Sequence, residues 1–142
     1  MTINVKVKRL YPDVDLPTKA HSADACFDLC AESDFVVYAG GRSAIPTGLS
    51  LAVPPGYKAQ IYSRSGLALR NGLVVIGGVV DSGYSGEVKV ILLNTTEDDY
   101  HGERGDKIAQ FAIEPVLDVE FAEVESLDET ERGSGGFGST GK

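Results

Sequence analysis

Residues that cross-link small proteins or bind metals are scarce in this sequence, which has two cysteines and two histidines among 142 residues. Cys26 and Cys30 lie four positions apart in a segment expected to be extended, which would separate them by about 13 Å. A disulfide needs Cα atoms about 4.4–6.8 Å apart, so this pair is excluded from forming one. The same counts argue against a structural zinc site. We expect both cysteines to be small, buried, apolar residues.

Long apolar runs and positive charge are scarce as well. No stretch approaches the roughly 18 apolar residues of a membrane span, and residues 1–8 lack the apolar segment of a secretory signal. We therefore expect a cytoplasmic protein with no membrane partner. Lys and Arg number 13 against 21 Asp and Glu, giving a formal net charge of −8. Because nucleic-acid binding needs a basic face, we expect no nucleic-acid partner.

Two common catalytic patterns, G-x-S-x-G and H-E-x-x-H, are missing from the chain. What the chain does contain is short apolar segments divided by turn signals about every ten residues. The segments expected to be strands are 5–8, 24–31, 35–38, 49–53, 58–62, 87–93 and 116–124. This spacing predicts a single all-β domain, a sandwich or barrel, with one short helix at 66–71 that Gly72 ends.

Polar residues at the turns between these segments are the candidates for chemistry. Arg64, Ser65 and Gly66 open the short helix, and their guanidinium, hydroxyl and backbone N–H groups are donors that suit an anion. Taken alone, a capping turn with a surface arginine is an equally good interpretation. Asp28 lies between two apolar residues of an expected strand, so its carboxylate needs an arginine or the water shell of a metal as partner. Gln110 is the odd polar residue in the strand that follows Gly105-Asp106-Lys107.

Two further segments have both a structural and a functional interpretation. Two valines lead directly into Asp81, which we expect at a partly desolvated strand end where a carboxylate can act on water. A plain β-hairpin with Asp and Gly as turn formers is the alternative, and Gly77-Gly78 fits either. The glycine-rich segment 132–142 is a disordered end, or else a lid whose Arg, Phe and hydroxyl groups close over a phosphate ligand.

Taken together in their order along the chain, these segments resemble the trimeric all-β dUTPase family over nearly the whole sequence. The matching stretches are Arg64-Ser65-Gly66-Leu67-Ala68, Gly78-Val79-Val80-Asp81-x-x-Tyr84-x-Gly86, Gly105-Asp106-Lys107-Ile108-Ala109-Gln110 and Arg132-Gly133-x-Gly135-Gly136-Phe137-Gly138-Ser139-Thr140-Gly141. The resemblance implies a distorted jelly-roll β-barrel with one short helix over residues 1–131 and a mobile C-terminal lid over residues 132–142. It also implies a homotrimer with active sites at the subunit interfaces.

By this resemblance, the reaction is hydrolysis of dUTP to dUMP and pyrophosphate, which limits uracil in DNA and supplies dUMP for dTMP synthesis. Asp81 matches the residue that activates the water attacking the α-phosphorus. Arg64, Ser65 and Gly66 match the segment that binds the phosphates, with the serine donating where charge builds on the leaving group. Gln110 matches the residue that contacts the phosphate near the point of attack.

The resemblance also assigns the nucleoside contacts. Tyr84 matches the tyrosine packed under the deoxyribose, where it crowds out a 2′-OH. The hairpin that runs through Gly78, Val79 and Val80 to Tyr84 matches the element that recognises uracil through its backbone. Lys89 falls where the family makes a main-chain contact to the nucleotide.

The metal and the tail follow from the same resemblance. Mg²⁺ is implied as the cofactor, bound mainly by the triphosphate, and Asp28 matches the acidic residue near the waters of that ion. In the tail, Arg132 and Ser139 match contacts to the distal phosphates. Phe137, followed by Gly138, matches the ring laid over the uracil. In the family this tail reaches a neighbouring subunit.

The chain departs from the family pattern at three places, and two other functions stay open. Cys26 stands where the family usually has Gly, Ser63 stands where Pro is common, and the uracil hairpin is shorter than in many bacterial members. One alternative is a deoxycytidine triphosphate deaminase of the same fold, whose pattern is Arg-Ser-Ser at positions 64–66. The other is a non-catalytic binding module. If the chain comes from a phage, a regulatory protein partner is a further prediction.

Overall fold

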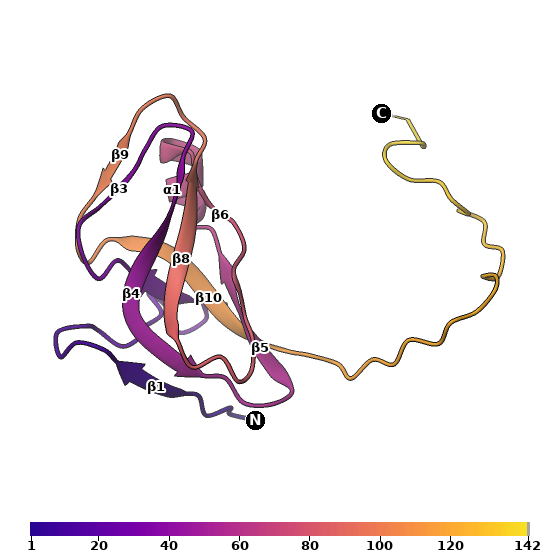
Figure 1. Cartoon of the computed structure of the whole chain (residues 1–142), viewed down its shortest axis with the longest axis horizontal. Helices are drawn as coiled ribbons and strands as arrows, with labels where there is room; N and C mark the ends of the chain where they lie inside the picture. The colour runs from indigo at the N-terminus through magenta and orange to yellow at the C-terminus, as the bar shows by residue number, and fades with distance from the viewer. Residues whose placement is uncertain (142) are drawn as a thin grey trace.

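The computed structural model describes residues 1–141 and confirms the all-β class. The strands are β1 Lys6–Arg9, β2 Phe27–Cys30, β3 Phe35–Val37, β4 Arg42–Ala52, β5 Tyr57–Tyr62, β6 Leu73–Val75, β7 Val79–Val80, β8 Glu87–Asn94, β9 Tyr100–Gly102 and β10 Lys107–Pro115, and the helix is α1 Ser65–Asn71. They form the sheets β1-β4-β8-β6 and β2-β10-β5-β7 and a ribbon of β3 and β9, all with antiparallel pairing (Figure 1).

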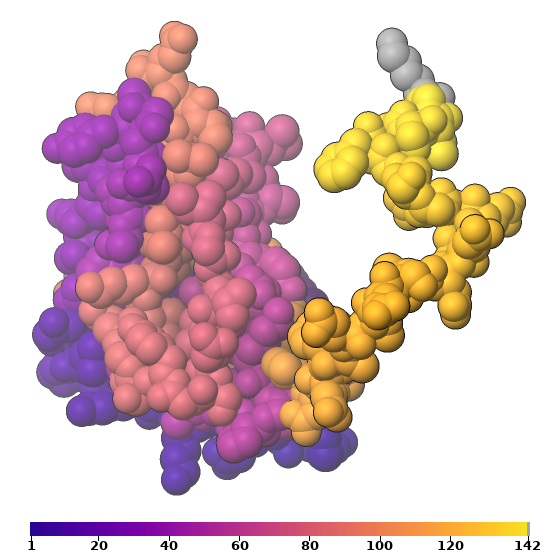
Figure 2. Space-filling model, turned by 45° about the vertical axis from the view of Figure 1, so that its right-hand side comes forward, coloured from indigo at the N-terminus to yellow at the C-terminus, as the bar shows by residue number. Residues whose placement is uncertain are grey.

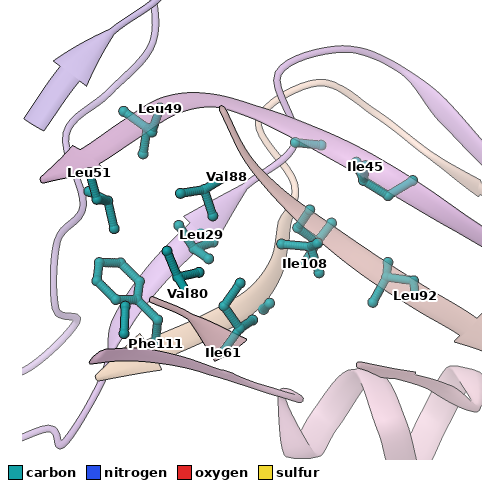
Figure 3. Packing of buried hydrophobic residues seen from close by; sticks show 14 of the residues in the cluster. Leu29, Ile45, Leu49, Leu51, Ile61, Val80, Val88, Leu92, Ile108 and Phe111 are labelled. Carbon is teal, nitrogen blue, oxygen red and sulfur yellow. The ribbon is translucent and has the colours of Figure 1, made fainter. Parts of the chain in front are cut away.

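The hydrophobic core fills the space between the two four-stranded sheets (Figure 3). Alternate residues of β8 supply Val88, Val90 and Leu92 to it. Ile61 of β5 and Phe111 of β10 enter from the other sheet. This alternation is what a strand with one covered face requires, and it leaves the intervening side chains on the outer faces.

The short helix matches the sequence prediction and begins one residue earlier, at Ser65. Gly72 ends it in the left-handed conformation, with φ of 63°, and donates its N–H to the Ala68 carbonyl at 3.0 Å. A Cβ at this position would also lie 2.6 Å from the side chain of Thr96. Glycine is therefore required both by the backbone angle and by the close approach of the next loop.

Strand β10 contains a β-bulge that the sequence does not predict. Lys107 lies opposite Cys30 of β2 while Ala109 lies opposite Leu29, so one extra residue is inserted in β10. Ile108 and Ala109 are consequently both buried although they are consecutive. The insertion turns Lys107 to the outer face of the sheet, the face away from the core.

The strand predicted at 116–124 is wrong for the single chain. β10 ends at Pro115, and the chain then leaves the body without regular structure as far as residue 141 (Figures 1 and 2). Apolar side chains along it are exposed, Leu117 by 81% and Phe121 by 94%. A strand needs hydrogen-bonding partners, and the described part of the chain places no strand beside this one. The predicted domain boundary at 131 stays a prediction.

Smaller differences concern the cysteines and the strand bounds. Cys26 and Cys30 are free thiols, as expected, but they are only half-buried and do not belong to the core. β4 begins at Arg42, well before the predicted strand at 49–53. The first half of the strand is not predicted because Pro46 and a register shift between Pro46 and Ser50 interrupt the alternation of the sequence. Within residues 1–141, no helix has the length and hydropathy to span a membrane.

Candidate active site

Three of the predicted site residues converge on the outer face of the sheet β2-β10-β5-β7. Asp28 of β2 lies directly opposite Gln110 of β10. Arg64, which follows the end of β5, has its Nε 4.0 Å from Asp28 Oδ1. The amide of Gln110 donates from Nε2 to the Ser63 carbonyl at 2.9 Å, so β10 is held against the start of the helix. Segments far apart in the sequence thus form one surface.

Lys107 completes this group, which we call the Asp28 cluster (Asp28, Arg64, Lys107 and Gln110). Lys107 Nζ lies 2.9 Å from Asp28 Oδ2, and Arg64 Nη1 donates to the Lys107 carbonyl at 3.2 Å. The cluster carries two cations and one carboxylate, so its own charges leave one positive charge in a protein whose net charge is −8. That charge suits phosphate. Asp28 and Lys107 also line a cavity of about 510 Å³ whose further wall includes Asp13 and Asp15.

Ser65 and Gly66 follow directly as the first residues of α1. Arg64 occupies the N-cap position with an extended backbone, and its side chain makes no capping hydrogen bond to the helix. The Ser65 side chain is exposed. The hydroxyl and the first backbone N–H groups of the helix therefore lie beside the Asp28 cluster as additional donors.

A second group of predicted residues forms the hairpin pocket, a cavity of about 320 Å³. Its lining includes Gly78, Val79, Val80, Asp81 and Tyr84 of the hairpin and Lys89 and Ile91 of β8. Gly78 has φ of 102°, and a Cβ there would lie 2.8 Å from the Ile61 carbonyl oxygen. Ile61 in turn donates its N–H to the Gly78 carbonyl at 2.8 Å, so the hairpin is bound tightly to β5. Only glycine permits this approach.

Tyr84 and Asp81 are exposed residues of the pocket lining. Tyr84 Oη donates to the Glu87 carbonyl at 2.9 Å, and its ring lies over Gly86, where a Cβ would be 2.6 Å from Oη. Asp81 follows β7 directly, and its carbonyl accepts the Tyr84 N–H at 3.2 Å. The expectation that Asp81 is partly desolvated is wrong for the single chain, because the residue is exposed at a turn.

The Asp28 cluster and the hairpin pocket do not meet within one chain. Val80 pairs with Ala59 on one side of β5, whereas Gln110 pairs with Tyr62 on the other side. Their partners on β5, Ala59 and Tyr62, are three residues apart along the strand, and β7 and β10 are two strand spacings apart across the sheet. Together these two offsets place Val80 and Gln110 on the order of 14 Å apart. One phosphorus atom therefore cannot contact Asp81 and Gln110 of the same chain.

The predicted tail residues lie apart from both groups. Arg132, Phe137, Gly138 and Ser139 are exposed, and the tail stands clear of the body (Figures 1 and 2). The hydrogen bonds of these residues stay within the tail, such as Arg132 Nε to the Gly135 carbonyl at 2.8 Å. Within the described residues, the tail makes no contact with the site to which the resemblance assigns it.

Comparison with known families decides the assignment. The dUTPase family model matches residues 13–141. The chain belongs to the dUTPase family. It is 48% identical over 143 residues to the deoxyuridine 5'-triphosphate nucleotidohydrolase of Thermobifida fusca, with 99% of this chain and 80% of that protein covered. It is 46% identical over 140 residues to that of Clostridium tetani, with 97% of each chain covered.

Among solved structures, a mutant dUTPase of Staphylococcus bacteriophage 80alpha with dUpNHpp resembles this chain with a TM-score of 0.90. The two are 27% identical, and the match covers 99% of this chain and 100% of that one. The fold of this dUTPase family member thus agrees with that of a relative solved with a nucleotide analogue.

The sequence does not predict two contacts of this candidate site. In a regular strand, residues 107 and 110 face opposite sides, so their spacing argues against a shared surface, and only the bulge joins them. Ser63 is the second: its Oγ accepts the Val75 N–H at 2.8 Å, and its carbonyl accepts from Gln110. In the sequence, the one sign of a special role for residue 63 is that Ser63 stands where the family commonly has Pro.

Proposed function

We propose that this chain hydrolyses dUTP to dUMP and pyrophosphate, limiting uracil in DNA and supplying dUMP for dTMP synthesis. One observation carries the proposal: the chain presents two complementary half-sites. The Asp28 cluster is cationic and suits phosphates. The hairpin pocket has about 320 Å³ for a nucleoside, and its lining includes the exposed carboxylate of Asp81. The names of the relatives and the dUpNHpp bound to the phage enzyme support this substrate.

Each half-site has a defined role in this mechanism. Asp81 accepts a proton from the water that attacks the α-phosphorus, and the bond to the bridging oxygen breaks so that pyrophosphate leaves. Arg64, Ser65 and Gly66 donate to the phosphate oxygens, where negative charge grows in the transition state. Gln110 contacts the α-phosphate, and its orientation is fixed by the bond to the Ser63 carbonyl.

Magnesium fits this arrangement as an ion held mainly by the substrate. Within residues 1–141, no group of three or more His, Cys, Asp or Glu converges to form an all-protein metal site. Mg²⁺ commonly binds substrate phosphates together with one carboxylate and several waters, and Asp28 is the carboxylate of the cationic cluster. When bound, the ion neutralises the charge of the triphosphate. Asp28 would hold it through water.

Substrate selection follows from the hairpin pocket. The backbone of Gly78, Val79 and Val80 reads the uracil edge, and Lys89 supplies a main-chain contact. The Tyr84 ring packs under the deoxyribose. Because Oη is held by the Glu87 carbonyl, the ring cannot move aside for a 2′-OH without losing that hydrogen bond.

The separation of the half-sites calls for more than one copy of the chain. In a homotrimer, the Asp28 cluster of one copy meets the hairpin pocket of the next, which brings Asp81 to the phosphates. The exposed apolar side chains of the segment after β10, including Leu117 and Phe121, support such an assembly because a single chain leaves them uncovered. Sedimentation equilibrium tests it: the expected mass is that of three chains, and a monomer that hydrolyses dUTP would contradict it.

The tail is the third part of the proposed site. Residues 1–131 form the body and residues 132–142 a lid that closes over the site of a neighbouring copy. Arg132 and Ser139 bind the distal phosphates, and Phe137, followed by Gly138, covers the uracil. Fixing about ten residues costs on the order of 10 kcal/mol, which these contacts only just offset. The lid therefore closes on the triphosphate and opens once pyrophosphate forms.

The mechanism is tested by Asp81→Asn. This variant keeps the shape of the side chain and removes the proton acceptor, so we expect it to bind dUTP and lose hydrolysis. Pyrophosphate release with Mg²⁺ and binding of dUpNHpp are measured on the same preparation. Asp98→Asn, in another exposed turn, is the control and keeps full activity. Near-normal hydrolysis by Asp81→Asn would show that another group activates the water.

A further inference from the structure

The bulge in β10 is what brings Lys107 to Asp28. A regular strand would place residue 107 on the core side when Gln110 faces outward. The inserted residue pairs Lys107 with Cys30, two positions from Asp28 on the same face of β2. Bulges interrupt the hydrogen-bond ladder and are frequent beside active sites, where they redirect a side chain. Here the redirected side chain is a cation aimed at a carboxylate.

Asp28 has two cations within reach but forms a close ion pair with only one of them. Lys107 Nζ lies at 2.9 Å from Oδ2, within hydrogen-bonding distance, whereas Arg64 Nε lies at 4.0 Å from Oδ1. The Asp28 side chain is only 16% exposed, so its charge is neutralised mainly by the cations of the cluster. Lys107 supplies that neutralisation. Most of the donors of the Arg64 guanidinium are thus left for another ligand.

Arginine and lysine differ in how they pair with a carboxylate. A guanidinium forms two parallel hydrogen bonds to one carboxylate, while an ammonium acts as a compact point charge. Without Lys107, Asp28 would draw Arg64 inward by about 1 Å into such a two-bond pair. The face of Arg64 that suits phosphate would then be occupied by Asp28.

We propose that Lys107 is a positioning residue that keeps Arg64 available to the phosphates by neutralising Asp28. This inference rests on the proposed function, because it assigns Arg64 to phosphate. Lys107 acts through Asp28 and does not need to touch the substrate. The bulge at Ile108 is the structural feature that makes this arrangement possible, since it orients Lys107 outward.

A double-mutant cycle separates this role from that of a simple nearby charge. Wild type, Lys107→Gln, Asp28→Asn and the double variant are compared for binding of dUpNHpp in EDTA, which removes the effect of Asp28 on the metal. In the wild-type background, we expect Lys107→Gln to weaken binding about tenfold. In the Asp28→Asn background no carboxylate can capture Arg64, so the same change should weaken binding less than about threefold. An equal loss in both backgrounds would overturn the proposal.

Kinetics and controls complete the test. Lys107→Gln should raise the KM for dUTP about tenfold and change kcat less than about threefold, and Lys107→Arg should restore the wild-type KM. Lys58→Gln removes a lysine that pairs with Glu114 on the same sheet and should change neither value. Thermal melts show whether each variant is folded. A wild-type KM in Lys107→Gln would overturn the inference about Lys107. A wild type that binds dUpNHpp but does not release pyrophosphate would instead contradict the proposed function.

Discussion

Replacing Gly86 by alanine tests the role of Tyr84 through a contact that can be measured in the structure. A Cβ at position 86 would lie 2.6 Å from Tyr84 Oη and 2.7 Å from Cζ, whereas ordinary contacts begin at 3.4 Å. The ring must therefore move by about 0.8 Å or more to relieve the overlap. Gly86 does not have a positive φ, so alanine fits the backbone and the effect is purely steric.

The expected magnitude follows from what the ring loses. Moving it breaks the hydrogen bond from Oη to the Glu87 carbonyl, worth about 0.5–1.5 kcal/mol. Because Tyr84 is 49% exposed, the ring can turn toward solvent, and the protein should stay folded. Losing the ring from under the deoxyribose removes about 2 kcal/mol of transition-state binding, roughly thirtyfold in kcat/KM for dUTP. The 2′-OH is then no longer excluded, so the preference for dUTP over UTP should fall.

The assay is pyrophosphate release from dUTP and from UTP by wild type, Gly86→Ala and Tyr84→Phe. Tyr84→Phe is the matched control, since it removes the hydrogen bond from Oη without forcing the ring out of its position. We expect Gly86→Ala to lose both rate and sugar discrimination, and Tyr84→Phe to lose much less of either. A folded Gly86→Ala protein with an unchanged ratio of dUTP to UTP activity would refute this account of Tyr84.

Three further predictions concern the tail, the thiols and the core. Deleting residues 133–142 should leave the Tm unchanged and cut turnover by orders of magnitude, because the hydrogen bonds of the described residues 133–141 stay within residues 130–141; full activity would exclude a lid. Burial, and then the neighbouring Asp28 carboxylate, raises the pKa of the Cys30 thiol, so alkylation should be slow at pH 7 and accelerate beyond pH 9, and rapid labelling at pH 7 would contradict this. Asn94 is 0% exposed and donates to the Val37 carbonyl at 3.0 Å, so Asn94→Ala should cost about 2–4 kcal/mol in urea unfolding, and a cost below about 1 kcal/mol would contradict it.

The parts of the fold that depend on a short stretch of sequence could be predicted. Gly72 ends the helix because the turn needs a left-handed residue, and the alternation of β8 shows directly which side chains face the core. The segment 116–124 has the same alternation and is not a strand here. Alternation shows only that one face needs covering, and it does not say whether the partner lies in the same chain.

The candidate site was predictable residue by residue but not as an arrangement. The need of Asp28 for a cationic partner follows from its position between apolar residues, and the structure supplies Lys107 and Arg64. The place of Lys107 beside Asp28 could not be predicted, although the residue lies in a matching stretch, because its spacing to Gln110 is wrong for a regular strand and the bulge has no sequence signature. The distance between Asp81 and the Asp28 cluster depends on which side of β5 each strand pairs, and this is a property of the topology.

One assay of the wild-type protein decides whether this chain hydrolyses dUTP. Pyrophosphate release is measured with Mg²⁺ for dUTP, dTTP, dCTP and UTP, and ammonia release is followed from dCTP. We expect rapid pyrophosphate release from dUTP, far slower release from the other three nucleotides, and no ammonia. Ammonia from dCTP, or binding of dUTP without pyrophosphate release, would contradict it, the first indicating a deaminase and the second a binding module.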